Sequence, residues 1–584
     1  MSKACGFKVK IGLEDVRKFK RIFSSPAAKQ VILWSQCVHW KIVWICILNI
    51  VTVLCSLAVT LVTKNLVDAA VSSNDDLLWR FGVILLVLVL AEIAIRIILS
   101  FLRIKASSKL QRNLQGRLVR EVLTKEYASV KGYHSGELVN RVFSDTGVIR
   151  NGVLSILPGI ISTVVSFIGA AAILIALDWR FVLLLTCAGL IGTVIVMLFR
   201  KPMKERHKRM QQAEDKLHAS IQESLENIRL IKASISEERV LRQIDKRQKT
   251  METEQVRQGK FSIVMNNSMG MMFSFSWLFC MLWGCTAIFR GEMTYGALAA
   301  MIQLIGRVQG PIASAVSIAT ELYGVIASTE RLMQLTSLPS DTTGKALDDF
   351  DEIYVNHVTF RYEDGTDDVL RNITCTVEKG DFVALTGASG GGKTSLFQLL
   401  LGIYPPNSGN VVFRKGNEEI PACRETRALL AYVPQGNTLF SGTLRENLTM
   451  FTDEASEMEI KEAVHVACIE DLVDDVGLDS ELGERGVGIS EGQAQRIAVA
   501  RALLTKAPIL LLDESTSALD EETEARMLHN ISAMRDKTCL IVTHRKAALS
   551  ICDYRLHIVE GRMTKEAAEL VDQEDTCIIT ESQD

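Results

Sequence analysis

The sequence has almost no net charge and no regular cysteine pattern. Its 65 lysines and arginines nearly balance 68 aspartates and glutamates, which leaves a net charge of −3. Domains that bind nucleic acid usually carry a strong basic excess, so we expect no nucleic-acid partner. The thirteen cysteines are scattered, and no two have the CxxC or zinc-ligand spacing. Several lie within apolar runs, and we interpret them as reduced packing residues.

An apolar start is also missing. The N-terminal residues up to about residue 28 are charged and polar, so we expect no cleaved signal peptide. The chain of 584 residues is too long for one compact core. A mean hydropathy of +0.19 together with 23% charged residues indicates an apolar half joined to a polar half.

Long apolar runs are absent after residue 320 but frequent before it. Six runs reach or nearly reach the ~20 residues that cross ~30 Å of hydrocarbon as a helix. They occupy residues 42–63, 81–102, 153–177, 181–199, 261–289 and 295–319. The first, third, fourth and fifth contain no Asp, Glu, Lys or Arg. The sequence therefore predicts an all-α membrane domain with six transmembrane helices.

The connections after the second and fourth runs are long and basic at their membrane ends. They are about 50 and about 60 residues in length. The positive-inside rule places them, and with them both termini, in the cytoplasm. Within them, residues 109–125 and 210–249 lack proline and repeat Leu, Val or Ile every three or four positions. These segments predict amphipathic helices that extend the spans into the cytosol.

A few polar residues lie inside the apolar runs. Glu92 and Arg96 are four residues apart and could neutralise each other on one helix face. Arg307 could line a water-filled pathway and contact an anionic part of a substrate, or it could pair with Glu92. We interpret residues 266–268, an Asn-Asn-Ser cluster, as cavity-lining or as directed toward the membrane surface.

The second half contains a phosphate-binding motif. The apolar run 382–386 predicts a buried strand, which leads into GASGGGKTS at residues 387–395 and then into a helical run. This is GxxxxGK[ST] between a strand and a helix, the context that the motif requires. The glycines let backbone N–H groups surround phosphates at a helix N-terminus. Lys393 would bridge the β- and γ-phosphates, and the Thr394 hydroxyl would bind Mg²⁺.

Two further strands bring polar residues to the same sheet edge. The continuous aliphatic run 509–512 predicts a parallel strand buried on both faces, and it ends in Asp513 and Glu514. Asp513 would hold Mg²⁺ through water, and Glu514 would polarise the attacking water as the general base. A third strand, 539–542, delivers Thr543 and His544.

In order and spacing these motifs resemble the ABC transporter family, exporter type, with fused membrane and ATP-binding domains. The resemblance covers almost the whole chain. ISEGQ at residues 489–493 resembles the family signature, and SALD at 517–520 resembles the D-loop. Gln435 resembles the Q-loop glutamine, His544 the switch histidine and Tyr362 the aromatic residue that stacks on adenine. Residues 481–486 resemble the X-loop, and residues 135–141 and 223–232 resemble coupling segments.

The resemblance implies an all-α six-helix transmembrane domain followed by an α/β P-loop NTPase (ABC) domain. The expected boundaries are 1–40 for a cytoplasmic N-terminal elbow segment, 41–335 for the transmembrane domain, 336–348 for a linker and 349–584 for the nucleotide-binding domain. ATP and Mg²⁺ are the expected cofactors. The expected catalytic residues are Glu514, His544 and Gln435, and the magnesium residues are Thr394, Gln435 and Asp513. The nucleotide-binding residues are Tyr362, Gly387, Ser389, Gly390, Gly391, Gly392, Lys393, Thr394, Ser395, Ser490, Gly492, Gln493 and Asp520.

One ATP-binding cassette and six spans imply that two half-transporters form the working unit. In the family, each ATP lies between the phosphate loop of one chain and the signature of the other, so Ser490 would act across the dimer. Glu491 departs from the family pattern, which usually has two glycines after the serine. It fits a heterodimer in which this signature serves a weak ATP site, or a variant tolerated in a homodimer.

The expected function is ATP-driven export of an amphipathic small molecule, a lipid or a peptide by alternating access. An importer built on the exporter fold and an ATP-gated or regulatory membrane protein are the alternatives. ABC ATPases of DNA repair or translation lack six spans. We expect a multi-pass protein of a bacterial plasma membrane, in contact with membrane lipid, a transported substrate and a second half-transporter.

Overall fold

The structure, a computed structural model, describes residues 25–133, 135–363, 365–452, 454–483, 488–534 and 536–567. At positions 182–201, 204, 265, 266, 268, 269, 272, 311–313, 315, 316 and 319 it describes the backbone but not the side chain. The chain folds into two compact units. The first comprises Met1–Arg120 and Ser135–Thr336, and the second comprises Glu121–His134 and Ser337–Asp584.

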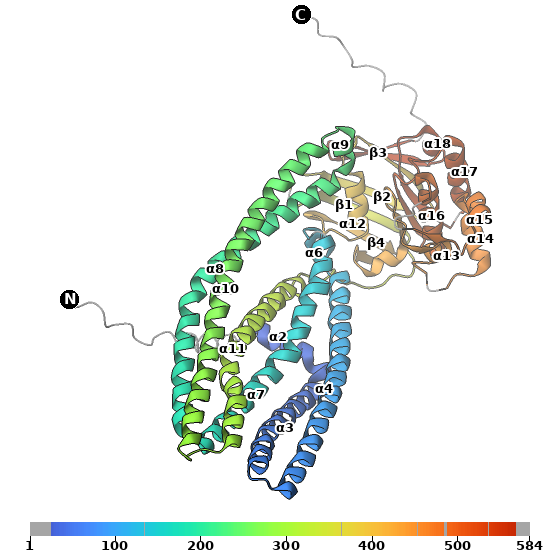
Figure 1. The fold of residues 1–584 in the computed structure, drawn as a ribbon. Coiled ribbons are helices and arrows are strands. Elements are labelled where there is room, and N and C mark those ends of the chain that lie inside the picture. The colour runs from blue at the N-terminus through green and yellow to red at the C-terminus, as the bar shows by residue number, and fades with distance from the viewer. Residues whose placement is uncertain are drawn as a thin grey trace, which may run out of the picture. The chain divides into compact units, whose positions relative to one another are not determined.

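The first unit is helical throughout its described residues (Figure 1). Its helices are α2 (Pro26–Ser35), α3 (His39–Val71), α4 (Asp75–Leu123, whose last residues belong to the second unit), α6 (Ser135–Asn140), α7 (Thr146–Leu177), α8 (Trp179–Glu226), α9 (Ile228–Ala233), α10 (Glu237–Phe289) and α11 (Tyr295–Thr336). Two short turns, η1 (Gln36–Val38) and the π-helical η2 (Arg141–Asp145), connect them. Asp178 begins α8 by accepting a hydrogen bond from the Arg180 backbone N–H at 2.9 Å, a typical N-cap.

Each of the six predicted apolar runs lies within one of the long helices α3, α4, α7, α8, α10 and α11. Among the described residues, three helical segments are long and apolar enough to cross a membrane: Pro26–Val71, Asp75–Leu123 and Ser135–Leu177. A shorter apolar segment, Phe273–Phe289, lies in α10. On α4 the large side chains of Val87 and Ile97 are 58% and 64% exposed, as expected for a helix whose surroundings are lipid.

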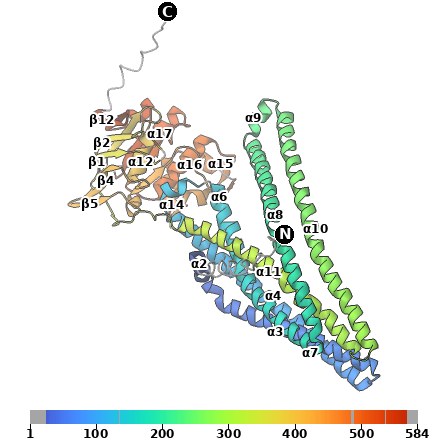
Figure 2. The same ribbon diagram turned by 90° about the vertical axis from the view of Figure 1, so that its left-hand side faces the viewer.

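The amphipathic extensions form helices as the sequence predicts, with one interruption. Residues 109–123 continue α4. Residues 210–249 divide into the end of α8, the short helix α9 and the beginning of α10, because the chain turns at Asn227 and again at Ser234. Helices α8 and α10 then run side by side, as Figures 1 and 2 both show.

Two polar predictions inside the apolar runs have different outcomes. Arg96 donates from Nε to Glu92 Oε1 at 3.1 Å, which confirms the predicted pair. Arg307 does not pair with Glu92; its guanidinium donates to the backbone carbonyl of Ser56 at 3.3 Å and to the Ser56 hydroxyl. The side chains of Asn266 and Ser268 lie outside the described residues.

The second unit contains two main sheets. The strands are β1 (Glu352–Phe360), β2 (Leu370–Glu378), β3 (Phe382–Gly387), β4 (Ser408–Lys415), β5 (Glu418–Pro421), β6 (Leu430–Val433), β7 (Gly442–Thr443), β8 (Glu481–Leu482), β9 (Ile509–Asp513), β10 (Thr538–Val542), β11 (Tyr554–Val559) and β12 (Arg562–Ala567). A six-stranded sheet has the order β12-β11-β3-β10-β9-β6, in which all neighbours except β11 and β12 run parallel. A four-stranded antiparallel sheet has the order β2-β1-β4-β5, and β7 pairs with β8.

Helices cover both faces of the six-stranded sheet. They are α12 (Lys393–Leu400), α13 (Leu444–Leu448), α14 (Glu457–Val466), α15 (Glu470–Val476), α16 (Glu491–Leu504), α17 (Glu521–Ser532) and α18 (Lys546–Leu549), with the 3₁₀ turn η3 (Glu425–Leu429). On β3, Ala384 packs into a core with α14, α16 and α17, whereas Val383 and Leu385 pack into a core with α12 and the antiparallel sheet. Successive strand residues point to opposite faces, so both cores share one sheet.

The second unit also includes a segment from between α4 and α6. Residues 124–126 run beside residues 338–341: the Glu126 N–H donates to Pro339 O at 3.1 Å and the Asp341 N–H to Thr124 O at 3.0 Å. Helix α5 (Tyr127–Lys131) follows, and Ala128 packs against the apolar core that contains α12. These residues fall within the predicted transmembrane domain 41–335, but they pack with the sheets of the second unit.

Candidate nucleotide site

The candidate site lies at one edge of the six-stranded sheet. Strands β3, β10, β9 and β6 are parallel neighbours, so their carboxyl ends meet at the same edge, where open α/β sheets bind their ligands. The loop 388–392 follows β3, His544 follows β10, Glu514 follows β9 and Gln435 follows β6. The topology therefore brings together residues that are up to about 150 positions apart in the sequence.

The loop after β3 has a backbone that only glycine allows at two positions. Gly387 has φ +143°, and a Cβ there would lie 2.2 Å from Ile558 O. Gly392 has φ +103° at the N-terminus of α12, and a Cβ would lie 2.6 Å from a Leu370 methyl group. A side chain at either position would displace the loop, so both positions require glycine.

Lys393 is held by the same loop. Its ammonium donates to Gly387 O at 2.8 Å and to Ala388 O at 3.0 Å, and the residue is 5% exposed. The side chain thus folds back over the loop that precedes it. A phosphate placed in the loop would meet this ammonium and the free N–H groups at the start of α12.

Asp513 lies beside Thr394. The Thr394 hydroxyl donates to Asp513 Oδ1 at 3.1 Å, and the Tyr432 hydroxyl donates to Oδ2 at 3.1 Å. Burial raises the pKa of Asp513, and the two hydroxyl donors partly oppose this shift by stabilising the carboxylate. Burial and the neighbouring carboxylate raise the pKa of Tyr432, which keeps its proton for donation.

These residues fit a magnesium ion that arrives with a nucleotide. Hydroxyl and carboxylate oxygens are hard ligands, which Mg²⁺ prefers together with phosphate oxygens and water. Within the described ranges no cluster of three or more His, Cys, Asp or Glu side chains could hold a metal. One carboxylate and one hydroxyl suit an ion whose other ligands come from phosphate and solvent.

Glu514 and Gln435 contact each other directly. Gln435 Nε2 donates to Glu514 Oε2 at 2.6 Å. Glu514 has φ +49°, an unusual left-handed conformation for a glutamate. The strand ends at Asp513, so this backbone turns the Glu514 side chain toward the Gln435 loop rather than along the strand. The pair joins the ends of β9 and β6.

His544 is exposed, and no hydrogen bond of its side chain occurs in the described part of the chain. Its neighbour Arg545 is anchored. The Arg545 guanidinium donates to Leu519 O at 2.6 Å, to Ser517 O at 2.7 Å and to Glu524 Oε2 at 2.9 Å. Arg545 therefore fixes the 517–520 turn beside the end of β10.

The signature residues form a helix cap. The Ser490 hydroxyl accepts from the Gln493 N–H at 3.2 Å, and Gln493 Oε1 accepts from the Ser490 N–H at 2.9 Å. This reciprocal capping box begins α16. Glu491 is exposed in the first turn, where a negative charge stabilises the helix end.

The signature and the 517–520 turn are in close contact. A Cβ on Gly492 would lie 2.9 Å from Ala518 O. Three residues after Gly492 on α16, buried Gln495 accepts from the Ala518 N–H at 3.1 Å and donates to Ser517 Oγ at 3.4 Å. Asp520 then caps α17 by accepting from the Thr523 N–H at 2.9 Å, and this hydrogen bond lowers the pKa of Asp520.

Helix α16 also supports the loop that follows Gln435. Its buried residue Arg501 donates to Thr438 O at 3.1 Å and to Thr438 Oγ1 at 2.8 Å. The guanidinium lies 5.0 Å from the ring centroid of Phe451, and burial lowers its pKa. One helix therefore carries the signature at its start and a support for the Gln435 loop near its end.

Tyr362 lies beside the phosphate loop. Its hydroxyl makes hydrogen bonds of 2.9 Å to Ser395 Oγ and to Gln398 Oε1 on α12. Its ring packs edge-to-face with Phe360 and with Tyr404, at centroid distances of 4.8 and 5.3 Å. The predicted adenine-stacking residue is thus tied to the helix that begins with Lys393.

The structure brings one group of predicted residues together and leaves a second group apart. Lys393, Thr394, Asp513, Glu514 and Gln435 meet at the sheet edge, and Tyr362 joins them through Ser395. Across the described residues, no hydrogen bond or ion pair links Ser490, Gln493 or Asp520 to the phosphate loop. Part of the predicted X-loop, residues 484–486, lies outside the described residues.

Sequence reasoning missed four residues that hold the site: Tyr432, Gln495, Arg501 and Arg545. Each lies within three residues of a motif position or on the signature helix, so proximity to a motif was the available signal. Their partners are 21 or more residues away in the sequence, and no local pattern reveals those contacts.

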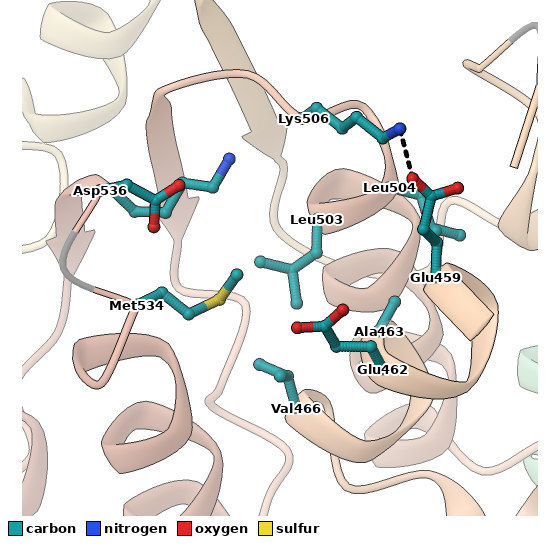
Figure 3. Close-up of a pocket in the computed structure, with 10 residues that line it drawn as sticks. Glu459, Glu462, Ala463, Val466, Leu503, Leu504, Lys506, Met534 and Asp536 are labelled. Atoms are coloured by element: carbon teal, nitrogen blue, oxygen red, sulfur yellow. Dashed lines mark ion pairs between the residues drawn. The ribbon is translucent and has the colours of Figure 1, made fainter. Parts of the chain in front are cut away.

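A groove elsewhere in the second unit is separate from this site. It has a volume of about 300 Å³ and lies between α14, the end of α16 and the start of β10 (Figure 3). Glu459 and Lys506 form an ion pair across its rim, and Leu503 and Met534 line its floor. None of the predicted nucleotide-site residues lines it.

Two family models match parts of this chain. Residues 42–312 match the family model for the ABC transporter transmembrane region, and residues 370–517 match a second family model, described as ABC transporter. The chain belongs to the ABC transporter family. An ABC transporter chain of this kind is an integral membrane protein whose ATPase activity is coupled to transport.

Curated relatives with the same fused organisation come from bacteria. A multidrug resistance ABC transporter ATP-binding and permease protein of Lactococcus lactis subsp. lactis (strain IL1403) is 29% identical over 443 residues, 74% of each chain. The probable multidrug resistance ABC transporter protein YheI of Bacillus subtilis (strain 168) is 29% identical over 469 residues, 78% of this chain and 79% of the relative.

A solved structure supports the fold. A bacterial Atm1-family ABC exporter with ATP bound matches with a TM-score of 0.76 and 21% identity. The match covers 91% of this chain and 95% of the other. At this identity the likeness establishes the exporter fold and leaves the transported substrate open.

Proposed function

We propose that this ABC transporter chain is a half-transporter that exports an amphipathic small molecule, a lipid or a peptide by alternating access. The proposal rests on the division of the predicted ATP site into a phosphate-loop half and a signature half. The phosphate-loop half is assembled within one chain. In the described part of the chain, the side chains of the signature residues Ser490 and Gln493 hydrogen-bond only within the cap of α16. Export is supported by the names of the two relatives, a multidrug resistance protein and a probable multidrug resistance protein.

In the proposed mechanism, ATP enters the loop 387–392 and draws Lys393 from the loop carbonyls to its β- and γ-phosphates. Mg²⁺, held by Thr394, Asp513 and water, with Gln435 nearby, would neutralise charge on the transferred phosphoryl group. Glu514 orients the attacking water and accepts its proton as the water oxygen bonds to the γ-phosphorus. The bond from the γ-phosphorus to the β–γ bridging oxygen breaks in the same step, and ADP is the leaving group. His544, which follows the neighbouring strand β10, would donate a hydrogen bond to the γ-phosphate.

A second chain completes each site in this proposal. Ser490, Gly492 and Gln493 of the opposite chain would contact the γ-phosphate through hydroxyl and backbone N–H donors at the start of α16. Asp520 would place the D-loop against the other phosphate loop. Glu491 leaves two dimers open: a heterodimer in which this signature serves a weak site, and a homodimer that tolerates the substitution.

The domain boundaries are part of the proposal. Residues 1–40 form an elbow segment, 336–348 the linker and 349–584 the nucleotide-binding domain. Residues 41–335 form the six-span domain, except that residues 121–134 pack with the nucleotide-binding unit. The basic connections after the second and fourth spans place those loops and both termini in the cytoplasm. Helices α6 and α9 carry the segments that would couple the two domains. Because the relatives are bacterial, we place the protein in a bacterial plasma membrane.

The test is ATPase activity of the purified chain in lipid nanodiscs, with the particle mass measured in parallel. Glu514→Gln is the matched variant. A homodimer with robust hydrolysis that Glu514→Gln abolishes supports a self-sufficient transporter. A monomer or an inactive homodimer indicates a missing partner chain.

Direction needs a second measurement. Inside-out vesicles supplied with ATP should accumulate an amphipathic fluorescent probe if the chain exports it. ATP-dependent loss of the probe from the same vesicles indicates an importer. Ion current or conformational change without probe movement indicates an ATP-gated or regulatory protein.

A further inference from the structure

Helix α5 places a cation over the predicted adenine-stacking ring. The Lys131 ammonium lies 5.2 Å from the ring centroid of Tyr362, over its face. Lys131 is exposed, and in the described part of the chain it forms no ion pair with an acidic side chain. The aromatic ring is therefore the neighbour that holds this ammonium, through a cation–π interaction.

The rest of the Tyr362 side chain faces the interior of the second unit. Phe360 and Tyr404, which pack against the ring, are only 2% and 8% exposed. The hydroxyl is bonded to Ser395 and Gln398 on α12. A planar base that arrives from solvent thus meets the ring on the side where the exposed residue Lys131 lies.

The position of Lys131 is fixed by its own segment. Tyr127, one turn earlier on α5, packs edge-to-face with Tyr404 at a centroid distance of 6.0 Å. Lys125 donates from Nζ to Leu338 O at 2.7 Å, and residues 124–126 pair with residues 338–341. These contacts hold the backbone of α5 near Tyr404, which itself packs against the Tyr362 ring, so Lys131 projects from an anchored segment.

We propose that Lys131 and the base of ATP compete for the same face of Tyr362, so that base binding displaces Lys131 and is sensed by residues 121–134. A stacked base contacts a ring over its whole face, and this interaction is stronger than that of an exposed ammonium. The base of ATP therefore displaces Lys131 from the ring, but ATP binds more weakly than it would if the Tyr362 ring were uncovered. The inference rests on the proposed role of Tyr362 in stacking adenine.

The test compares ATP affinities in the full-length chain in nanodiscs, with Glu514→Gln present to prevent hydrolysis. Lys131→Met keeps the aliphatic stem and removes the ammonium. It should tighten ATP binding two- to fivefold, which is the range for an exposed cation–π contact. Lys461→Met, which removes an exposed lysine from α14, is the matched charge control and should leave the affinity unchanged.

Two further arms separate the base from the phosphates. Inorganic tripolyphosphate has the charges of ATP but no base, and Lys131→Met should not tighten its binding. With Tyr362→Leu present, which removes the stacking ring, Lys131→Met should no longer tighten ATP binding. An unchanged or weaker ATP affinity in Lys131→Met alone overturns the competition.

Displacement also has a direct readout. ATP should increase the rate at which an amine-reactive ester acylates Lys131, measured by mass spectrometry, and leave the rate at Lys461 unchanged. A slower rate at Lys131 would mean that the lysine closes over the base, which overturns the proposal. If the wild-type chain binds no ATP, or if Lys393→Ala leaves ATP binding intact, the proposed nucleotide site itself fails, independently of Lys131.

Discussion

Lys393 and Ser490 belong to two halves of the predicted ATP site, and their surroundings differ. Lys393 is 5% exposed and bonded to carbonyls of its own loop, while Asp513 beside it is 2% exposed and bonded to two hydroxyls. Ser490 and Glu491 are exposed at the start of α16, and within the described residues the side chain of Ser490 hydrogen-bonds only in the helix cap. The phosphate-loop half is formed by contacts within this chain, whereas the signature half exposes the N-terminus of α16 to solvent.

The contrast indicates that the two halves of the site have different roles. The buried half keeps its charges close to compensating groups, so it can be pre-organised before ATP arrives. The exposed half has free N–H groups at a helix N-terminus, which attract an anion from outside. Substitutions in the two halves should therefore separate ATP binding from ATP hydrolysis.

The largest effect is expected at the phosphate loop. Lys393→Ala removes the ammonium that donates to the carbonyls of Gly387 and Ala388 in the phosphate loop. We expect ATP binding and kcat/KM to fall about 100-fold or more, as for other losses of a pre-organised charge. Titration with a fluorescent ATP analogue measures the binding, with Lys461→Ala as the control. Near-normal binding would show that the loop carbonyls, rather than phosphates, are the partners of this lysine.

The next variant separates chemistry from binding within the same half. Glu514→Gln keeps the size of the side chain but cannot accept a proton, so hydrolysis should fall about 100-fold or more. ATP affinity should change little, because Asp513, Thr394 and Lys393 are untouched. Phosphate release and ATP binding are measured on the same sample. Hydrolysis that persists in this variant would exclude Glu514 as the general base.

The connection between the halves depends on Arg545. Arg545→Ala leaves the carboxylate of Glu524, whose side chain is 0% exposed, without its guanidinium partner. Arg545 itself is one-third exposed, so we expect local stability to fall by about 2 kcal/mol, less than for a fully buried pair. Amide exchange of residues 517–520 measures this local opening. Arg545→Ala with Glu524→Gln should recover part of the loss, and failure to recover would mean that the carbonyl contacts dominate.

A smaller effect is expected where the signature meets the D-loop. Gly492→Ala places a methyl carbon 2.9 Å from Ala518 O, so one of the two segments must shift. We expect hydrolysis to fall about tenfold through misplacement of the signature, with ATP binding to the phosphate loop unchanged. A parallel loss of ATP binding would contradict the separation of the halves.

The smallest effect concerns Glu491. Replacing it with glycine removes a carboxylate from the helix end that would face the γ-phosphate. In a homodimer we expect the ATPase rate to rise two- to fivefold, the scale of one like-charge repulsion in a solvated site. Steady-state phosphate release measures the rate. An unchanged rate would mean that the carboxylate points away from the nucleotide, as its exposure and the stabilised helix end allow.

Much of the buried half was predictable from the sequence. The aliphatic runs 382–386, 509–512 and 539–542 correspond to β3, β9 and β10, because strands buried on both faces are apolar at every position. The motif glycines and Lys393 follow from the chemistry of phosphate binding. The contacts of Arg545, Gln495 and Arg501 could not be predicted from the sequence, because a single arginine or glutamine gives no sequence pattern that identifies its distant partner.

The membrane half shows the same limit. Composition alone located the six apolar runs, and each lies in a helix. It did not identify Ser56 as the partner of Arg307, because two residues 251 positions apart meet only through helix packing. Nor did it show that residues 121–134 pack with the sheets, because their amphipathic pattern specifies a buried face without specifying what buries it.

The membership of residues 121–134 in the second unit has a consequence for the ATPase as a modular part. A fragment beginning at Ser337 would lose the chain that runs beside Leu338 and Pro339, and its Tyr404 would lose Tyr127. Such a fragment would expose part of its core and be prone to self-association. The nucleotide-binding unit is therefore discontinuous in sequence. A chimera that moves only residues 337–584 into another transporter would leave behind residues 121–134, and with them part of the contacts of this unit.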